Sequence, residues 1–157
     1  MAVKNFQSQN DLKIVFKRFF LLLVVSVALN YPWEVLQMPL YVNGGDFLNF
    51  AKHCVVPAWG DAVIVMIIYS IGWVLTRNSA WADKPTASSY AIMLGVGFLI
   101  AVGVEWIAVF ELNRWNYTPR MPIIPGLSIG FSPVLQMLLL PPLIFKITAR
   151  VLKKVGN

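Results

Sequence analysis

Four stretches of apolar residues, interrupted by few polar positions, divide the chain. A helix needs roughly 20 apolar residues to cross a bilayer, and each of the four stretches reaches that length. The predicted spans are residues 16–41, 56–76, 90–112 and 127–148. The pattern therefore predicts an all-α integral membrane four-helix bundle, formed as one transmembrane domain over residues 1–157.

Composition supports a membrane protein rather than a soluble one. The chain is 58% hydrophobic and 13% charged, whereas soluble domains carry about 25% charged residues. Its net charge of +6 comes from basic residues that flank the apolar stretches. That placement is typical of a membrane face and gives no indication of nucleic-acid binding. The lone cysteine, Cys54, excludes an intramolecular disulfide.

The basic residues also predict an orientation. Ten of the 13 lysines and arginines lie in the N-terminal tail, in the connection between the second and third spans, and at the C-terminal end. The positive-inside rule then places both termini, including the tail of residues 1–15, in the cytoplasm. Trp73 and Trp81 would form an aromatic belt at that face, and Trp59, Trp106 and Trp115 one at the outer face.

The two predicted outer connections differ from ordinary linkers. Phe47, Phe50, Ala51 and Val55 are spaced as on one face of a helix, so we expect a short interfacial helix there. Residues 113–126 contain three prolines among bulky apolar side chains, which excludes a long helix. We expect this second connection to pack as a cap over the bundle.

Polar side chains inside the spans follow a helical spacing. In the first span, Asn30, Glu34, Gln37 and Tyr41 are separated by four, three and four positions, so they share one face. Ionisable groups inside a span are costly and are functional hypotheses by default. Glu34 is therefore a candidate acid or base.

The other spans become polar at the same predicted depth. Asp61 lies near the outer edge of the second span. Glu105 follows a stripe of small residues in the third span, which permits close helix approach. In the fourth span, Ser128, Ser132 and Gln136 are separated by four positions. The predicted orientation places all these groups in the outer half and leaves the inner half apolar.

This pattern predicts a polar pocket that opens to the outer face. Glu34, Asp61 and Glu105 are its candidate catalytic residues. The candidate ligand-binding residues are Asn30, Trp33, Gln37, Tyr41, His53, Glu111, Arg114, Trp115, Tyr117 and Gln136. Glu111 and Arg114 would pair at i and i+3 if the helix continued that far, or Arg114 would reach a buried acid.

Prolines give a reason for cavities at this depth. Pro32 and Pro39 would leave two carbonyls of the first span without their usual partners, and Pro133, Pro141 and Pro142 would do the same in the fourth. Carbonyls in lipid must find other donors, so kinked spans around polar side chains are expected.

Several alternatives remain beside the pocket. Asp61 could instead cap the N-terminus of the second span. His53 and Cys54 are adjacent, which is not a standard chelate spacing, so no metal and no cofactor are predicted. His53 is expected at the rim, hydrogen-bonded to an acid.

Short motifs carry a resemblance to a known group. WEVLQMPLY from Trp33, HC with a following GD, EW at Glu105, RWNYTPRMPIIPG from Arg114 and SPVLQ from Ser132 resemble a group of small four-span bacterial inner-membrane proteins. The resemblance implies that topology and a location in the bacterial inner membrane. It implies no activity.

Three hypotheses follow for function. The first is an outward-facing pocket, in a protein embedded in the lipid bilayer, that binds, or transforms by acid–base chemistry, a small amphiphile such as an isoprenoid or another lipid. The second is a proton- or cation-coupled carrier or channel subunit, which the apolar inner half disfavours unless a homo-oligomer supplies a path. The third is a non-catalytic assembly factor in which the polar groups specify helix–helix contacts.

Overall fold

The computed structural model describes residues 2–42 and 47–155 and is built from α-helices. The long helices are α1 (Ala2–Gln37), α3 (Val55–Thr76), α4 (Ala87–Trp106) and α5 (Phe131–Val155). The short ones are the 3-10 helix η1 (Met38–Leu40), α2 (Phe47–His53) and the π-helix η2 (Ile107–Glu111). No strand occurs in the described ranges, where only two isolated β-bridges are present.

Four of these helical segments are long and apolar enough to cross a membrane. They cover Lys13–Leu40, Ala51–Thr76, Ala87–Glu111 and Phe131–Lys154. Large apolar side chains on the outside of the bundle are widely exposed, as Phe20, Val74 and Leu99 show. Such a surface is unusual for a soluble monomer and suits contact with lipid tails. The predicted four-helix class is thus confirmed.

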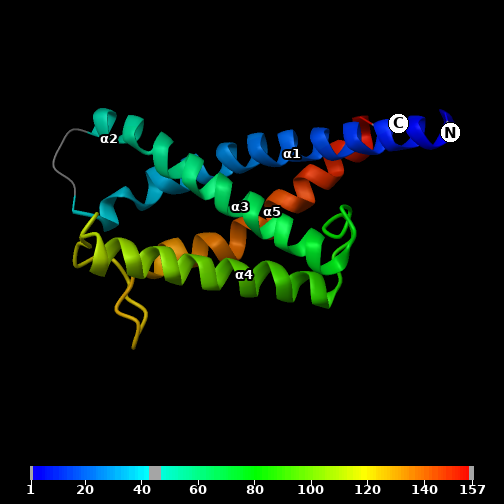
Figure 1. Cartoon of the computed structure of the whole chain (residues 1–157). Helices are drawn as coiled ribbons and strands as arrows, with labels where there is room; N and C mark the ends of the chain where they lie inside the picture. The colour runs from blue at the N-terminus through cyan, green and yellow to red at the C-terminus, as the bar shows by residue number, and fades with distance from the viewer. Residues whose placement is uncertain (1, 43–46, 156–157) are drawn as a thin grey trace.

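Helix α1 packs against α3 and α5, and α4 closes the ring by packing against the same two helices (Figure 1). The start of α1 and the end of α5 lie at one end of the bundle, which we call the terminal end (Figure 1). The opposite end carries α2 and residues 112–130, and we call it the capped end.

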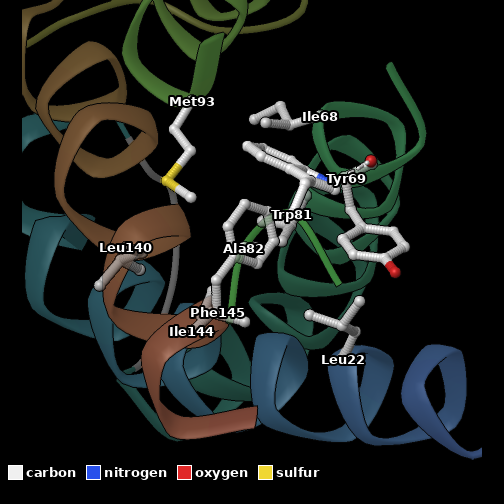
Figure 2. Close-up of a cluster of buried hydrophobic side chains, with 10 residues drawn as sticks. Leu22, Ile68, Tyr69, Trp81, Ala82, Met93, Leu140, Ile144 and Phe145 are labelled. Carbon is white, nitrogen blue, oxygen red and sulfur yellow. Dashed lines mark hydrogen bonds between the residues drawn. The ribbon is translucent and has the colours of Figure 1, made fainter. Parts of the chain in front are cut away.

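An aromatic core fills the bundle near the terminal end (Figure 2). Trp81, from the connection between α3 and α4, inserts among Tyr69 and Phe145 and donates its indole N–H to the carbonyl of Tyr69 at 3.1 Å. Its side chain lies so close to Gly72 that a Cβ there would be 2.1 Å from the ring. Trp81 is therefore a core residue, and the prediction of an interfacial belt position was wrong for it.

The same connection is tied to α1 by an ion pair. The guanidinium of Arg18 donates to both carboxylate oxygens of Asp83, with Nη2 and Oδ2 2.8 Å apart. Arg18 is 7% exposed, so one of the basic residues that flank the first apolar stretch is buried and paired. Together with Trp81, this pair closes the terminal end with the chain's own side chains.

The capped end is joined to α1 by backbone hydrogen bonds. Tyr41 and Tyr117 form an antiparallel bridge, flanked by bonds from Val42 N to Asn116 O at 2.8 Å and from Thr118 N to Leu40 O at 2.9 Å. The proline-rich connection contains no helix between Leu112 and Gly130. It therefore packs onto the end of α1, as the sequence predicts for a cap.

Two predictions about the fourth span need correction. Helix α5 begins at Phe131, so Ser128 lies in the connection, at a left-handed φ of 54°. The connection folds back on itself there, with Phe131 N bonded to Pro122 O at 2.8 Å. Pro133 falls in the first turn of α5, where its missing N–H has no helical acceptor to lose. Pro32, Pro141 and Pro142 do lie inside helices.

The contact between Gly72 and Trp81 gives a test of the packing at the terminal end. Gly72→Ala should lower the free energy of unfolding by about 1–3 kcal/mol, because the added methyl group collides with a buried ring. Gly95→Ala is the matched control, since a Cβ at Gly95 meets nothing within 4 Å. Thermal unfolding in detergent measures both, and equal midpoints for the two variants would contradict the packing.

Candidate functional site

A network of polar side chains links three helices in the half of the bundle nearer the capped end. Gln136, on α5, is its hub, and its side chain is 1% exposed. Its Nε2 donates to Asn30 Oδ1 on α1 and to Asp61 Oδ2 on α3, each at 2.8 Å. Asn30 in turn donates to the carbonyl of Ser26 at 2.9 Å. One amide thus joins α1, α3 and α5.

A second amide extends the network along α1. Gln37 Nε2 donates to Glu34 at 2.7 Å and more weakly to Gln136 Oε1 at 3.4 Å. Gln37 Oε1 accepts a hydrogen bond from Ser132 on α5 at 2.8 Å. The spacing of Asn30, Glu34 and Gln37 along α1 brings these side chains to one face, and that face lies toward α5.

Asp61 and Glu34 contact one another across α1 and α3. Besides Gln136, the side chain of Asp61 hydrogen-bonds to Glu34. A hydrogen bond between two carboxyl groups requires a proton on one of them. Asp61 does not cap its helix, because α3 begins at Val55 with Cys54 as its N-cap. The capping alternative was therefore wrong.

Glu105 enters from α4 and meets the cap. It is 4% exposed and continues the buried small-residue face of Gly97 and Ala101. A Cβ at Gly97 would lie 2.6 Å from the carbonyl of Met137, so α4 and α5 approach closely along this stripe, as predicted. Tyr117 and Trp115 donate to Glu105 Oε2, the latter at 3.4 Å.

The aromatic side chains around Glu105 form a group at the capped end. Tyr41 also hydrogen-bonds to Glu105, and its ring centroid lies 6.2 Å from that of Trp115 and 5.7 Å from that of Tyr117. Burial, and then the hydrogen bond to Glu105, raise the pKa of Tyr117 above its usual value. Tyr117 therefore keeps its proton and remains a donor to the Glu105 carboxylate at neutral pH.

Basic side chains are not partners of the network. Within the described residues the one ion pair is Arg18–Asp83, at the terminal end. Arg114 and Glu111 are exposed, and the structure records neither the predicted pair between them nor a contact from Arg114 to a buried acid. The reason is that the helical segment ends at Glu111, so the chain has turned away before Arg114.

The remaining candidates lie outside the network. Trp33 packs against the aromatic core, and its Nε1 is buried without a partner among the described residues. The Nδ1 of His53 is hydrogen-bonded to the carbonyl of Asn49 at 2.6 Å, within α2. The prediction that His53 would hydrogen-bond to an acid was therefore wrong for this nitrogen. Cys54 is buried. No group of three metal-binding side chains occurs in the part of the chain that the structure describes.

Sequence reasoning missed one residue of this region. Ser26 is fully buried, and its Oγ has no partner among the described residues. It precedes Asn30 by four positions, so it continues the polar face of α1 toward the terminal end. The four-residue spacing from Asn30 was the available signal, but a single serine in an apolar stretch does not by itself predict a polar site.

The best-defined hollows of the described chain lie elsewhere. A hollow of about 470 Å³ at the terminal end is lined by Thr76, Asn78, Ala80, Trp81, Asp83, Lys84, Thr86 and Ser89. A smaller one lies between Arg18 and Thr148. Neither is lined by Glu34, Asp61 or Glu105.

Comparison of the chain with protein-family models, curated proteins and solved structures finds no match.

The hub position of Gln136 gives a test. Gln136→Leu should lower the free energy of unfolding by roughly 2–4 kcal/mol, because Asn30 and Asp61 lose their shared donor while staying buried. Ser132→Ala, which removes one hydrogen bond to Gln37, should cost only about 1 kcal/mol. Denaturant titration in detergent measures both values. A Gln136→Leu variant as stable as Ser132→Ala would show that the hub is not needed for stability.

Proposed function

We propose that the protein binds a small amphiphilic, lipid-like molecule at the network around Glu34, Asp61 and Glu105, and acts on it by acid–base chemistry. The observation that carries the proposal is that Glu34, Asp61 and Glu105, from three helices, have only neutral hydrogen-bond donors among the described residues. Helix packing alone does not require acids in the spans, because apolar residues of similar size pack helices without the free-energy cost of placing an ionisable group in the membrane. Acids kept under that penalty are candidates for proton transfer.

The hydrogen bonds suggest a division of roles. The carboxyl pair of Glu34 and Asp61 holds a proton that one member gives and the other takes back, as in general acid–base catalysis. Glu105 accepts hydrogen bonds from neutral donors and would orient a polar group of the ligand beside it. Glu34 and Asp61 are partly exposed, so a polar head group could reach them while its tail stays among lipids.

We also propose that the capped end faces outward, in a bacterial inner membrane. The distribution of lysines and arginines supports this orientation, since they gather at the terminal end. The aromatic core and the Arg18–Asp83 pair pack between the helices near the terminal end, which favours exchange of the ligand through the capped end. The same packing disfavours a carrier with a path through a single chain.

A second candidate is a non-catalytic assembly factor, and the side-chain hydrogen bonds that join α1, α3 and α5 favour it. In that case the hydrogen bonds of Gln136 and Gln37 serve only to set the register of α1, α3 and α5. The two candidates differ in whether Glu34 touches a bound molecule.

Mass spectrometry of lipids that co-purify with the protein tests the proposal. Glu34→Gln keeps the size and the hydrogen bond to Gln37 but removes the acid. We expect wild type to retain a specific amphiphile and Glu34→Gln to lose it or to accumulate an altered species. Glu111→Gln, an exposed acid outside the network, is the control and should match wild type. Identical lipid profiles for all three proteins would favour the assembly factor.

A further inference from the structure

We infer that α5 is hinged at Pro141 and Pro142, and that bending at this hinge moves Gln136 away from α1 and α3 and opens the polar network to a ligand. This inference rests on the proposed function, since it names how that site opens. It is carried by two missing backbone hydrogen bonds, by a division of the apolar core in the same turn, and by the kinds of contact on either side of α5.

Two adjacent prolines interrupt the backbone hydrogen bonds of α5 near its middle. Pro141 and Pro142 have no N–H, so the carbonyls of Met137 and Leu138 lose the donors that a regular helix supplies four residues later. Helices bend sharply at such positions. In Figure 1 the start of α5 runs beside α4, and its end lies beside the start of α1. We call residues 131–140 the capped half of α5; its direction is only loosely fixed by the rest of the helix.

The apolar core divides into two clusters in the same turn. Leu140 and Ile144 belong to the aromatic core near the terminal end. Val134 and Met137 pack with Ala101 of α4 in a second cluster. The division along α5 thus falls between Met137 and Leu140, beside the two carbonyls that the prolines leave without helical donors. Hinges are formed by a few residues that join separately packed units, and this turn of α5 has that position.

Backbone contact and apolar packing hold the capped half of α5 to α4. A Cβ at Gly97 would lie 2.6 Å from the carbonyl oxygen of Met137, so the Cα of Gly97 lies against the carbonyl that Pro141 leaves without a donor. A Cα–H group in that position forms a weak hydrogen bond with a carbonyl. A polar ligand has nothing to replace in this contact, so the capped half stays with α4 when the hinge bends.

Side-chain hydrogen bonds hold the capped half to α1 and α3. Gln136 donates to Asn30 and to Asp61, and Ser132 donates to Gln37, each at 2.8 Å. A polar head group that takes the place of the Gln136 amide satisfies Asp61 in the same way, so these bonds are the ones that a ligand replaces. A ligand that binds only the open form shifts the population toward it. Gln136 covers the network again when the ligand leaves.

Distances between two spin labels on α5 test the hinge. Phe131→Cys and Lys153→Cys place the labels at exposed positions on either side of the prolines, in full-length protein with Cys54→Ala, reconstituted in lipid nanodiscs. Pulsed electron paramagnetic resonance measures the distribution of the distance. We expect a distribution at least about twofold wider than in the same protein with Pro141→Ala and Pro142→Ala, because the restored N–H groups complete the helix.

A label pair on α3 is the control. Val56→Cys and Val74→Cys are exposed, and their distribution should be narrow with or without the proline substitutions. Gln136→Leu, which removes the bonds to α1 and α3, should shift the α5 distribution toward the open form. An α5 distribution as narrow as that of α3, or one that Gln136→Leu leaves unchanged, would overturn the inference even if the proline variant does not fold.

The hinge and the proposed function fail in different ways. A narrow α5 distribution, together with an amphiphile that Glu34→Gln loses, removes the hinge and leaves the proposed function standing. A wide α5 distribution, together with lipid profiles that Glu34→Gln does not change, removes the proposed function and with it the role of the hinge in opening the site.

Discussion

The side-chain amide of Gln136 is the interaction on which the capped half of the bundle depends. A single nitrogen on α5 donates to Asn30 on α1 and to Asp61 on α3. Each of these groups lies where water is scarce, and an unsatisfied polar group there is expensive. The three helices therefore have one register in which all of these partners meet. Apolar packing alone would permit many registers, because lipid tails are as apolar as the helix faces.

The acidic side chains at the two ends of the bundle have different kinds of partner. At the terminal end, a base and an acid neutralise one another, and the ring of Trp81 fills the space above Gly72. At the capped end, the acids Glu34, Asp61 and Glu105 have neutral hydrogen-bond donors and no basic partner among the described residues. The Arg18–Asp83 pair therefore needs no further partner, whereas the acids at the capped end have none of opposite charge. This difference is why we propose a function at the capped end.

Much of this arrangement was predictable from helical spacing. Asn30, Glu34 and Gln37 share a face because four- and three-residue steps keep side chains on one side of a helix, and the stripe before Glu105 predicts its close contact with α5. Trp81 and Arg18 were not predictable, because both lie next to apolar stretches where aromatic and basic residues usually face the membrane interface. Their burial depends on a partner distant in sequence, Gly72 for one and Asp83 for the other. The same limit applies to Arg114, whose direction depends on where the helix ends.

Infrared spectroscopy tests whether the carboxyl groups of Glu34 and Asp61 share a proton, which we expect because they lie side by side with no basic partner among the described residues. At neutral pH the wild-type protein should show the C=O absorption of a protonated carboxylic acid. Asp61→Asn and Glu34→Gln should each remove or shift that absorption, because either substitution breaks the pair. Glu111→Gln, an exposed acid outside the network, should leave it unchanged. A wild-type spectrum without the absorption, or one that neither network variant alters, would contradict the account.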